Sequence, residues 1–108
     1  MRTAADLDAV FHALGDPTRR GILKMLTRGE RATGVIADRF SLSRPTISKH
    51  LGVLHRARLV SRRQIGRNQL YAITPRPLGA AHDWLGQYQR FWRLSLRQLK
   101  KHVEGQRR

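Results

Sequence analysis

The chain has 108 residues, enough for one domain, and 40% of them are hydrophobic, which excludes a disordered basic tail. It contains 22 Lys and Arg but only 7 Asp and Glu, so its formal net charge is +15. This charge predicts a polyanionic partner, with nucleic acid ahead of an anionic membrane surface. The absence of cysteine excludes disulfides, thiolate metal sites and thiol nucleophiles. Because there is neither an apolar signal region nor a membrane-spanning run, we expect a cytoplasmic protein with no membrane partner.

The positive charge is unevenly distributed along the chain. The stretch from Arg39 to His82 contains nine Lys and Arg residues and not one Asp or Glu. A basic surface with no particular role is one interpretation of such a stretch. An uninterrupted run of one sign that also contains folded elements instead favours contact with phosphates.

Two helices are predicted at the start of the chain. Leu7, Val10, Phe11 and Leu14 follow the i, i+3, i+4, i+7 spacing of one apolar helix face, which predicts a helix over Thr3–Leu14. Asp16 is a typical N-cap for a second helix, and Pro17 suits its first position.

A helix-turn-helix is predicted next. Thr33 is the expected cap of a short third helix, and Ser41-Leu42-Ser43 forms a tight turn after it. Ser43 then caps a fourth helix, whose inward stripe consists of Ile47, Leu51 and Leu54. Two short helices joined by such a turn form a helix-turn-helix.

The pattern then changes to β and back to helix. Leu59–Gln64 and Gln69–Ile73 are short β-capable runs separated by Ile65–Asn68, which predicts a basic hairpin, or wing. From Pro77 to about Val103, apolar residues recur every three or four positions, which predicts a single last helix. That helix is too long for so small a domain, so part of its apolar stripe needs a second subunit. We therefore expect one domain over residues 1–104 and a frayed basic tail over residues 105–108.

Three segments carry a resemblance to a known family. The segments GDPTRRGIL at 15–23, LSRPTISKHL at 42–51 and GRNQLY at 66–71 closely resemble the ArsR-type winged-helix repressors. The resemblance runs from Leu7 to Trp92 in unbroken order, and the closing aromatic pattern is similar to a subgroup without the cysteine metal-binding motif. It implies a mainly helical winged helix-turn-helix fold with a small β-hairpin, and four helices preceding that hairpin. It also implies a homodimer, built from the first and last helices, that represses by covering a promoter. The residues expected at that interface are Leu7, Val10, Phe11, Trp84, Leu85, Tyr88, Phe91 and Trp92.

Two departures from the family pattern concern the end of the recognition helix. Arg58 stands where the family usually has glycine, which takes a left-handed cap readily, and Gly52 weakens the helix by about 1 kcal/mol relative to Ala. Both bear on the angle at which the wing approaches DNA.

Double-stranded DNA is the expected partner of the fourth helix and the wing. Arg and Lys donate to guanine, Ser and Thr hydroxyls contact bases or phosphates, and the Pro45 ring offers apolar contact. For His50, contact with DNA and packing at the base of the helix both remain open, and Asn68 and Gln69 equally suit DNA contact or the turn and strand edge. The predicted recognition-helix contacts are Ser43, Arg44, Pro45, Thr46, Ser48, Lys49 and His50. The predicted wing contacts are Arg62, Arg63, Arg67, Asn68 and Gln69.

These features predict a sequence-specific homodimeric repressor at a palindromic operator. The alternative is a non-specific architectural DNA-binding protein, which shares the charge but not the mixed Ser, Thr and Arg face of the fourth helix. No acid–base pair or phosphate-binding glycine loop suggests an enzyme. We expect neither metal nor cofactor, because the histidines and acids of the last helix lack ligand spacing. No small-molecule effector is identified; the aromatic set near Trp84 suits a packed dimer core better than an organic-ligand pocket.

Overall fold

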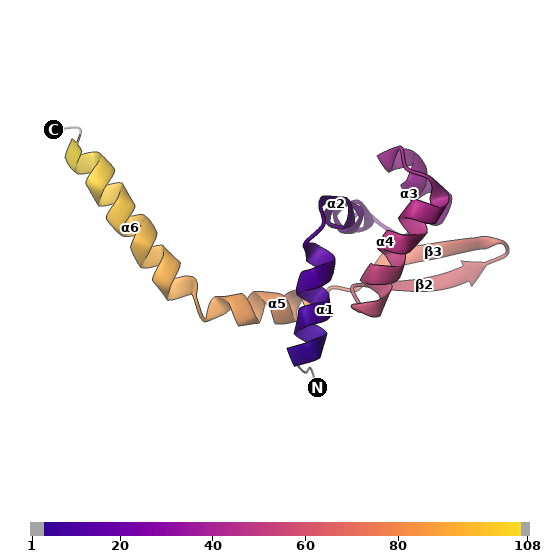
Figure 1. Ribbon diagram of the computed structural model, residues 1–108, viewed down its shortest axis with the longest axis horizontal. Helices are drawn as coiled ribbons and strands as arrows, with labels where there is room; N and C mark the ends of the chain where they lie inside the picture. The colour runs from indigo at the N-terminus through magenta and orange to yellow at the C-terminus, as the bar shows by residue number, and fades with distance from the viewer. Residues whose placement is uncertain (1–3, 107–108) are drawn as a thin grey trace.

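The computed structural model of the chain describes residues 4–106 and begins with two helices. Helix α1 spans Ala4–Leu14, and α2 spans Pro17–Leu26; Thr3, the predicted start of α1, lies outside the described residues. The Asp16 carboxylate accepts a hydrogen bond from the Arg19 backbone N–H at 3.0 Å, which confirms Asp16 as the N-cap of α2. Both helices lie at the centre of the molecule (Figure 1).

The helix-turn-helix consists of α3 (Thr33–Phe40) and α4 (Arg44–Arg56). Between them, Ser41 adopts a left-handed conformation with φ 55°, and the backbone N–H of Leu42 donates to the carbonyl of Ala37. Ser43 caps α4 as predicted, since its side chain accepts from the backbone N–H of Thr46. The prediction that Thr33 caps α3 is wrong, because Thr33 is already the first helical residue and follows a strand directly.

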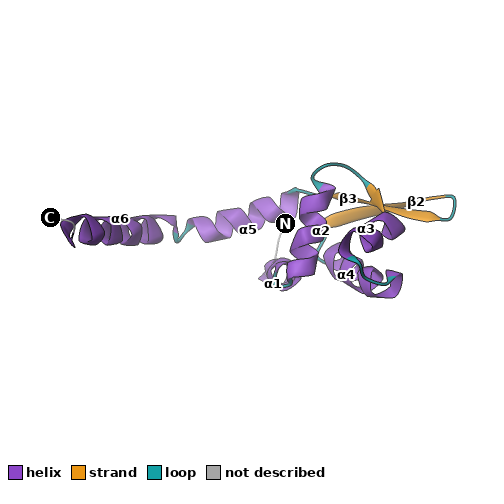
Figure 2. Ribbon diagram, turned by 90° about the horizontal axis from the view of Figure 1, so that it is seen from above, coloured by secondary structure: helices purple, strands orange, loops and turns teal. Residues whose placement is uncertain are grey.

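A three-stranded antiparallel sheet forms the wing and its base. Strand β2 (Val60–Ile65) pairs with β3 (Asn68–Ile73), and β1 (Arg31–Ala32) pairs with the other edge of β3. The hairpin is predicted correctly, whereas β1 is missed because two residues are too few to show a strand pattern. Of the two loop residues, Gly66 has φ 60°, a conformation open to glycine at no steric cost. Figure 2 shows the hairpin projecting from one end of the molecule.

The hydrophobic core lies where α1 to α4 meet the base of the sheet. Its members come from all of these elements, and Ala81 of α5 (Arg76–Gly86) joins them. Side chains with less than 2% exposure hold α4 against the rest of the unit. The largest are Ile22, Leu26, Ile36, Ile47, Leu51, Leu54 and Leu59.

The last part of the chain is two helices, so the prediction of one helix over 77–103 is wrong. Helix α5 ends at Gly86, and α6 (Gln89–Gln106) leaves it at an angle (Figure 1). The backbone N–H of Tyr88 donates to the carbonyl of Leu85 at 3.0 Å, a bond to the third rather than the fourth preceding residue. Gly86, the last residue of α5, is a weak helix former. The Gln87 side chain also donates to the Trp84 carbonyl at 3.0 Å, in competition with the backbone hydrogen bonds of a continuous helix. These contacts replace one helical turn with a bend.

The two C-terminal helices make the molecule elongated. It measures 65 × 35 × 21 Å, and its radius of gyration is 18.4 Å, whereas a compact chain of this length has about 13 Å. Residues 105 and 106 of the predicted tail are helical, and residues 107 and 108 lie outside the described residues. No helix within residues 4–106 has the length and apolar character needed to span a membrane.

Candidate nucleic-acid interface

Helix α4 has one completely buried face and one exposed face. Ile47, Leu51 and Leu54 are 0% exposed, which fixes the rotation of the helix about its axis. Its opposite face therefore points to solvent. The exposed residues at its N-terminal end are Ser43, Arg44, Pro45, Thr46, Ser48 and Lys49. They include two cations and three hydroxyls, the groups that donate to base edges and phosphates.

Ser43 and Arg44 also have structural contacts. The Ser43 hydroxyl lies 2.9 Å from the Thr46 hydroxyl, so both are oriented at the first turn of α4. The Arg44 guanidinium extends over α3: its Nη2 lies 2.7 Å from the position that a β-carbon on Gly34 would take. Glycine at position 34 thus leaves room for the guanidinium at the junction of the two helices.

His50 faces the body of the protein from the same helix. Its Nδ1 lies 3.8 Å from an Asp16 carboxylate oxygen and 3.4 Å from Nη1 of Arg19. Arg19 in turn donates from Nε to the Ala13 carbonyl at 2.8 Å and from Nη2 to the His12 carbonyl at 3.0 Å. Of the two roles open for His50, this position favours packing at the base of α4. The cluster ties α4 to the junction of α1 and α2.

Asp16 is held in its charged form within this cluster. The backbone N–H of Arg19 lowers the pKa of the Asp16 carboxyl, partial desolvation opposes the shift, and the nearby His50 lowers it further. A charged carboxylate is the better acceptor for the N-cap of α2.

The wing presents its cations unequally. Arg67 is at the hairpin tip and Arg62 faces Tyr71 across the strands; both are exposed and form no ion pair with the described residues. Asn68 is exposed beside the tip, whereas Gln69 is half-buried in β3. Arg62 and Arg67 are therefore available to an external anion.

Arg63 has a partner within the chain. Its Nε donates to one Glu30 oxygen at 2.8 Å and its Nη2 to the other at 2.7 Å, a bidentate pair that joins β2 to the residue before β1. The hydrogen bonds from Arg63 lower the pKa of the Glu30 carboxyl, and the same pair raises that of Arg63. Unlike Arg62 and Arg67, Arg63 is held against the base of the wing.

Sequence reasoning does not predict the contact of His50 with Asp16 or the pair of Arg63 with Glu30. The sequence predicts Asp16 only as a helix cap, and it predicts no role for Glu30. One signal was present, because Glu30 is the only acidic residue between Asp16 and Asp38. An isolated carboxylate among cations is a natural partner for one of them, but the sequence does not indicate which.

A second surface consists of apolar side chains on α1, α5 and α6. Phe11 contacts Trp84 edge-on with ring centroids 5.4 Å apart, and Trp84 contacts Tyr88 at 5.3 Å. Val10 is 3% exposed and belongs to the core of this chain, while Leu7 and Phe11 are half-buried. The remaining residues predicted at the interface are exposed by 42–71%: Trp84, Leu85, Tyr88, Phe91 and Trp92. Leu96, Leu99 and Val103 continue this exposed face along α6.

A metal centre finds no support in the described part of the chain. Within residues 4–106, no three His, Asp or Glu side chains are grouped so that they could hold an ion.

Known proteins share both the sequence and this architecture. Residues 14–63 match a helix-turn-helix domain family. The HTH-type transcriptional regulator Rv2034 of Mycobacterium tuberculosis is 40% identical over 96 residues, 89% of this chain and 87% of its own. The transcriptional repressor SdpR of Bacillus subtilis is 37% identical over 79 residues, 73% of this chain and 88% of its own.

Solved structures agree with this assignment. The crystal structure of an ArsR family transcriptional regulator superposes with a TM-score of 0.78 at 32% identity, covering 85% of this chain and 95% of its own. The homodimeric winged helix-turn-helix DNA-binding domain of Mb0332 from Mycobacterium bovis, a possible ArsR-family regulator, gives a TM-score of 0.62 at 29% identity. That match covers 94% of this chain and 84% of the other. The chain belongs to the ArsR family of winged helix-turn-helix transcriptional regulators.

Proposed function

We propose that this chain is a homodimeric repressor that binds a specific double-stranded DNA operator at a promoter. It acts in the cytoplasm by occupying DNA rather than by catalysis. Helix α4 enters the major groove, and Arg62 and Arg67 of the wing contact phosphates or the neighbouring minor groove. The operator is an imperfect palindrome whose half-sites lie about 34 Å apart, one turn of the duplex.

The observation that carries this proposal is the division of α4 into two faces. Its buried face fixes the helix rigidly on the core, and its exposed face combines Arg44, Thr46 and Ser48 at the N-terminal end. Base reading requires donors on a rigid support, since a displaced donor does not match the base edge. Two related regulators and the family assignment support the same function.

The homodimer is supported by the apolar surface of α5 and α6. Side chains such as Phe91, with 71% exposure, are too large and too many to face water in a stable monomer. A related DNA-binding domain is itself homodimeric. A second copy of this chain therefore covers the surface and sets the distance between the two α4 helices.

An architectural protein that compacts DNA is the alternative. It accounts for the positive charge, but not for the mixture of hydroxyls and cations on the exposed face of α4. Nor does it account for Arg63 of the wing, whose guanidinium pairs with Glu30. We therefore place this alternative second, and the specificity of binding distinguishes the two.

The first test is binding to DNA directly upstream of the coding sequence for this chain, compared with scrambled DNA of equal length and at physiological salt. A repressor prefers its operator by about 10³-fold or more. An upstream fragment recognised at two chains per site supports the proposal. Equal affinity for all fragments and for a random-sequence selection would instead favour the architectural alternative.

Two arginine variants then test the placement of the contacts. Arg44→Ala should weaken operator binding and relax base preference by about 1–3 kcal/mol at one position of each half-site. Arg67→Ala should weaken all sequences alike and reduce the salt slope by about 1 per subunit. Arg97→Ala on α6 removes the same charge far from α4 and serves as the control. Unchanged affinity in Arg44→Ala would refute the assignment of α4 as the base-reading helix.

A further inference from the structure

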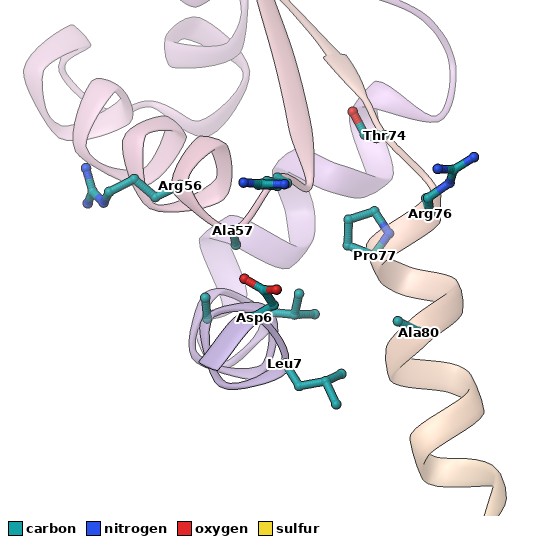
Figure 3. A pocket seen from close by; sticks show the side chains of 11 residues that line it. Asp6, Leu7, Arg56, Ala57, Thr74, Arg76, Pro77 and Ala80 are labelled. Carbon is teal, nitrogen blue, oxygen red and sulfur yellow. The ribbon is translucent and has the colours of Figure 1, made fainter. Parts of the chain in front are cut away.

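A cavity lies where α1 and the end of α4 meet the start of α5. Its volume is about 260 Å³, and its walls come from the start of α1, the end of α4 and the junction of β3 with α5. Figure 3 shows this arrangement, with Asp6 of α1 pointing toward Ala57 and Leu7 extending on the side of α1 that is nearer to α5. None of the contacts proposed with DNA uses this space, which is separate from the exposed face of α4.

The lining of this cavity combines an apolar floor with a positive rim. Leu7, Val10, Ala57 and Pro77 form part of the apolar floor. The charged side chains of the lining are three arginines, Arg56, Arg58 and Arg76, and one carboxylate, Asp6. In Figure 3, Arg56 and Arg76 lie on opposite sides of the cavity, and their guanidinium groups point away from it. A guanidinium beside a small apolar floor fits a compact organic anion, because guanidinium pairs with carboxylate while the floor accepts a hydrocarbon or ring.

Arg58 is the most informative residue of this rim. Its backbone has φ 62°, the left-handed region in which glycine has no steric penalty and other residues cost of order 1 kcal/mol or more. Its side chain is exposed and has no hydrogen bond or ion pair with the described residues. Within the described residues, the guanidinium therefore forms no polar contact that would offset its unfavourable backbone conformation.

The position of Arg58 connects this cavity to both DNA-contacting elements. It is the second residue after α4 and the second before β2, so it forms the hinge between the recognition helix and the wing. Its N–H donates to the His55 carbonyl at 3.0 Å, and the next residue, Leu59, accepts a bond from the Thr74 N–H at 2.8 Å. Thr74 also lines the cavity. A molecule held between Arg58, Thr74 and α1 would thus fix the hinge relative to the C-terminal helices.

We propose that this cavity is a binding site for a small organic anion, a carboxylate with a compact apolar body, held by Arg58 and the apolar floor. Occupation of the site weakens operator binding, because it restrains the hinge between α4 and β2 and adds negative charge close to these two DNA-contacting elements. The binding site stands independently of DNA, whereas its effect on the operator rests on the function proposed above.

The first experiment measures binding to the full-length protein without DNA, using benzoate, neutral benzamide and cationic benzylamine at constant ionic strength. A ligand of this size is expected to saturate at about 1 mM. We expect benzoate to bind at least about tenfold more tightly than the other two. In a nuclear magnetic resonance titration, the backbone amides of Ala57, Arg58 and Thr74 should shift together. Absence of saturation by about 10 mM, equal binding of benzoate and benzamide, or shifts confined to other surfaces would each overturn the proposal.

The variants separate this site from general anion binding. Arg58→Gly removes the guanidinium where the backbone already suits glycine, so the fold should be retained while benzoate binds at least about fivefold more weakly. Arg58→Lys should recover part of the affinity. Arg28→Ala removes a cation that does not line the cavity and should bind benzoate like the wild type. Equal benzoate affinity in Arg58→Gly and the wild type would overturn the assignment of the site.

The second experiment measures operator affinity at saturating benzoate. We expect at least about fivefold weaker binding for the wild type, little change for Arg58→Gly, and the same factor when operator DNA is used to weaken benzoate binding. Benzoate binding without any change in operator affinity would overturn the regulatory step. If the chain binds no operator, the proposed function fails while the DNA-free titration still decides the ligand site.

Discussion

The two halves of this molecule differ in how their apolar residues are used. From α1 to β3, one core holds large aliphatic side chains with exposures near zero, such as Ile22, Ile47 and Leu51. Among the described side chains of α5 and α6, only Pro77 and Ala81 are buried and Leu78 packs half-buried against the core, while the large apolar side chains from Trp84 to Val103 are exposed. Figure 2 shows these helices extending away from the rest of the chain. The first half therefore has a core within one chain, whereas the second half leaves an apolar surface exposed, which the proposed homodimer would cover.

This division suits a dimeric DNA-binding protein. A rigid α4 needs a core that does not depend on the partner, whereas the distance between two α4 helices has to be set by the partner contact. Substitutions in the first half are therefore expected to reduce the stability of the fold, and substitutions in the second half are expected to weaken association.

Leu51→Ala should produce the largest loss of stability. Leu51 is 0% exposed in the inner face of α4, and truncating such a leucine costs about 2–5 kcal/mol of unfolding free energy. Urea denaturation of dilute protein, where monomers prevail, measures it. Leu99→Ala on α6, with Leu99 59% exposed, is the control and should leave the dilute midpoint near that of the wild type. Similar losses in both variants would contradict a core confined to the first half.

Phe91→Ala should act on association instead of folding. Phe91 is 71% exposed in the protomer, and removing an aromatic side chain at the centre of an interface typically costs about 2 kcal/mol or more, roughly 30-fold in dimer affinity. Sedimentation equilibrium measures the dissociation constant. Arg90→Ala, the preceding residue on the same helix, is the matched control and should leave the dimer intact. A Phe91→Ala dimer as tight as the wild type would exclude this face from the interface.

The sequence predicts the first half better than the second. Apolar periodicity identifies the apolar face of a helix, but it does not show which element packs against that face. The stripe Ile47, Leu51 and Leu54 identifies both α4 and its buried side, and the capping residues Asp16 and Ser43 locate two helix starts. The apolar spacing across Gly86 to Tyr88 continues through the bend, so it predicts one helix where there are two. Only local hydrogen bonds of Gln87 and Tyr88 reveal the break.

The residues of the candidate DNA-binding site are predictable from the sequence where they follow from local pattern, but not where they depend on contacts between distant segments. The exposed face of α4 follows from the buried one, and the position of Arg67 follows from the hairpin loop. The pairing of Arg63 with Glu30 does not, since the two residues are 33 positions apart and meet only through the strand order β1-β3-β2. The left-handed conformation of Arg58 is expected once the family's usual glycine is known at that position.

Gly21→Ala should destabilise the first half moderately. A β-carbon at position 21 would lie 2.8 Å from the Phe40 ring, so α2 and α3 would have to separate, at a cost of about 1–3 kcal/mol. Gly79→Ala in α5 is the control, because its β-carbon meets nothing within 4 Å and should stabilise its helix by about 0.5–1 kcal/mol. Thermal unfolding compares them. We expect the unfolding temperature to fall in Gly21→Ala and to rise in Gly79→Ala. A stabilising Gly21→Ala would contradict the close packing of α2 on α3.

Glu30→Gln should have the smallest effect on stability and a measurable one on DNA binding. The Glu30 pKa is lowered from its ordinary value of 4.5, so the pair with Arg63 stabilises the folded state above that pH and is lost as the pH falls through the lowered value. The variant should therefore lose less stability than the wild type on acidification. Release of Arg63 adds a phosphate contact, which should steepen the dependence of log K on log salt by about 0.9 per subunit. Glu104→Gln, which breaks the exposed pair with Lys100 on α6, changes the same charge and should leave the slope unchanged. If both variants gave the wild-type slope, Arg63 would not contact phosphate even when it is released from Glu30. The phosphate contacts of the wing would then come from Arg62 and Arg67 alone.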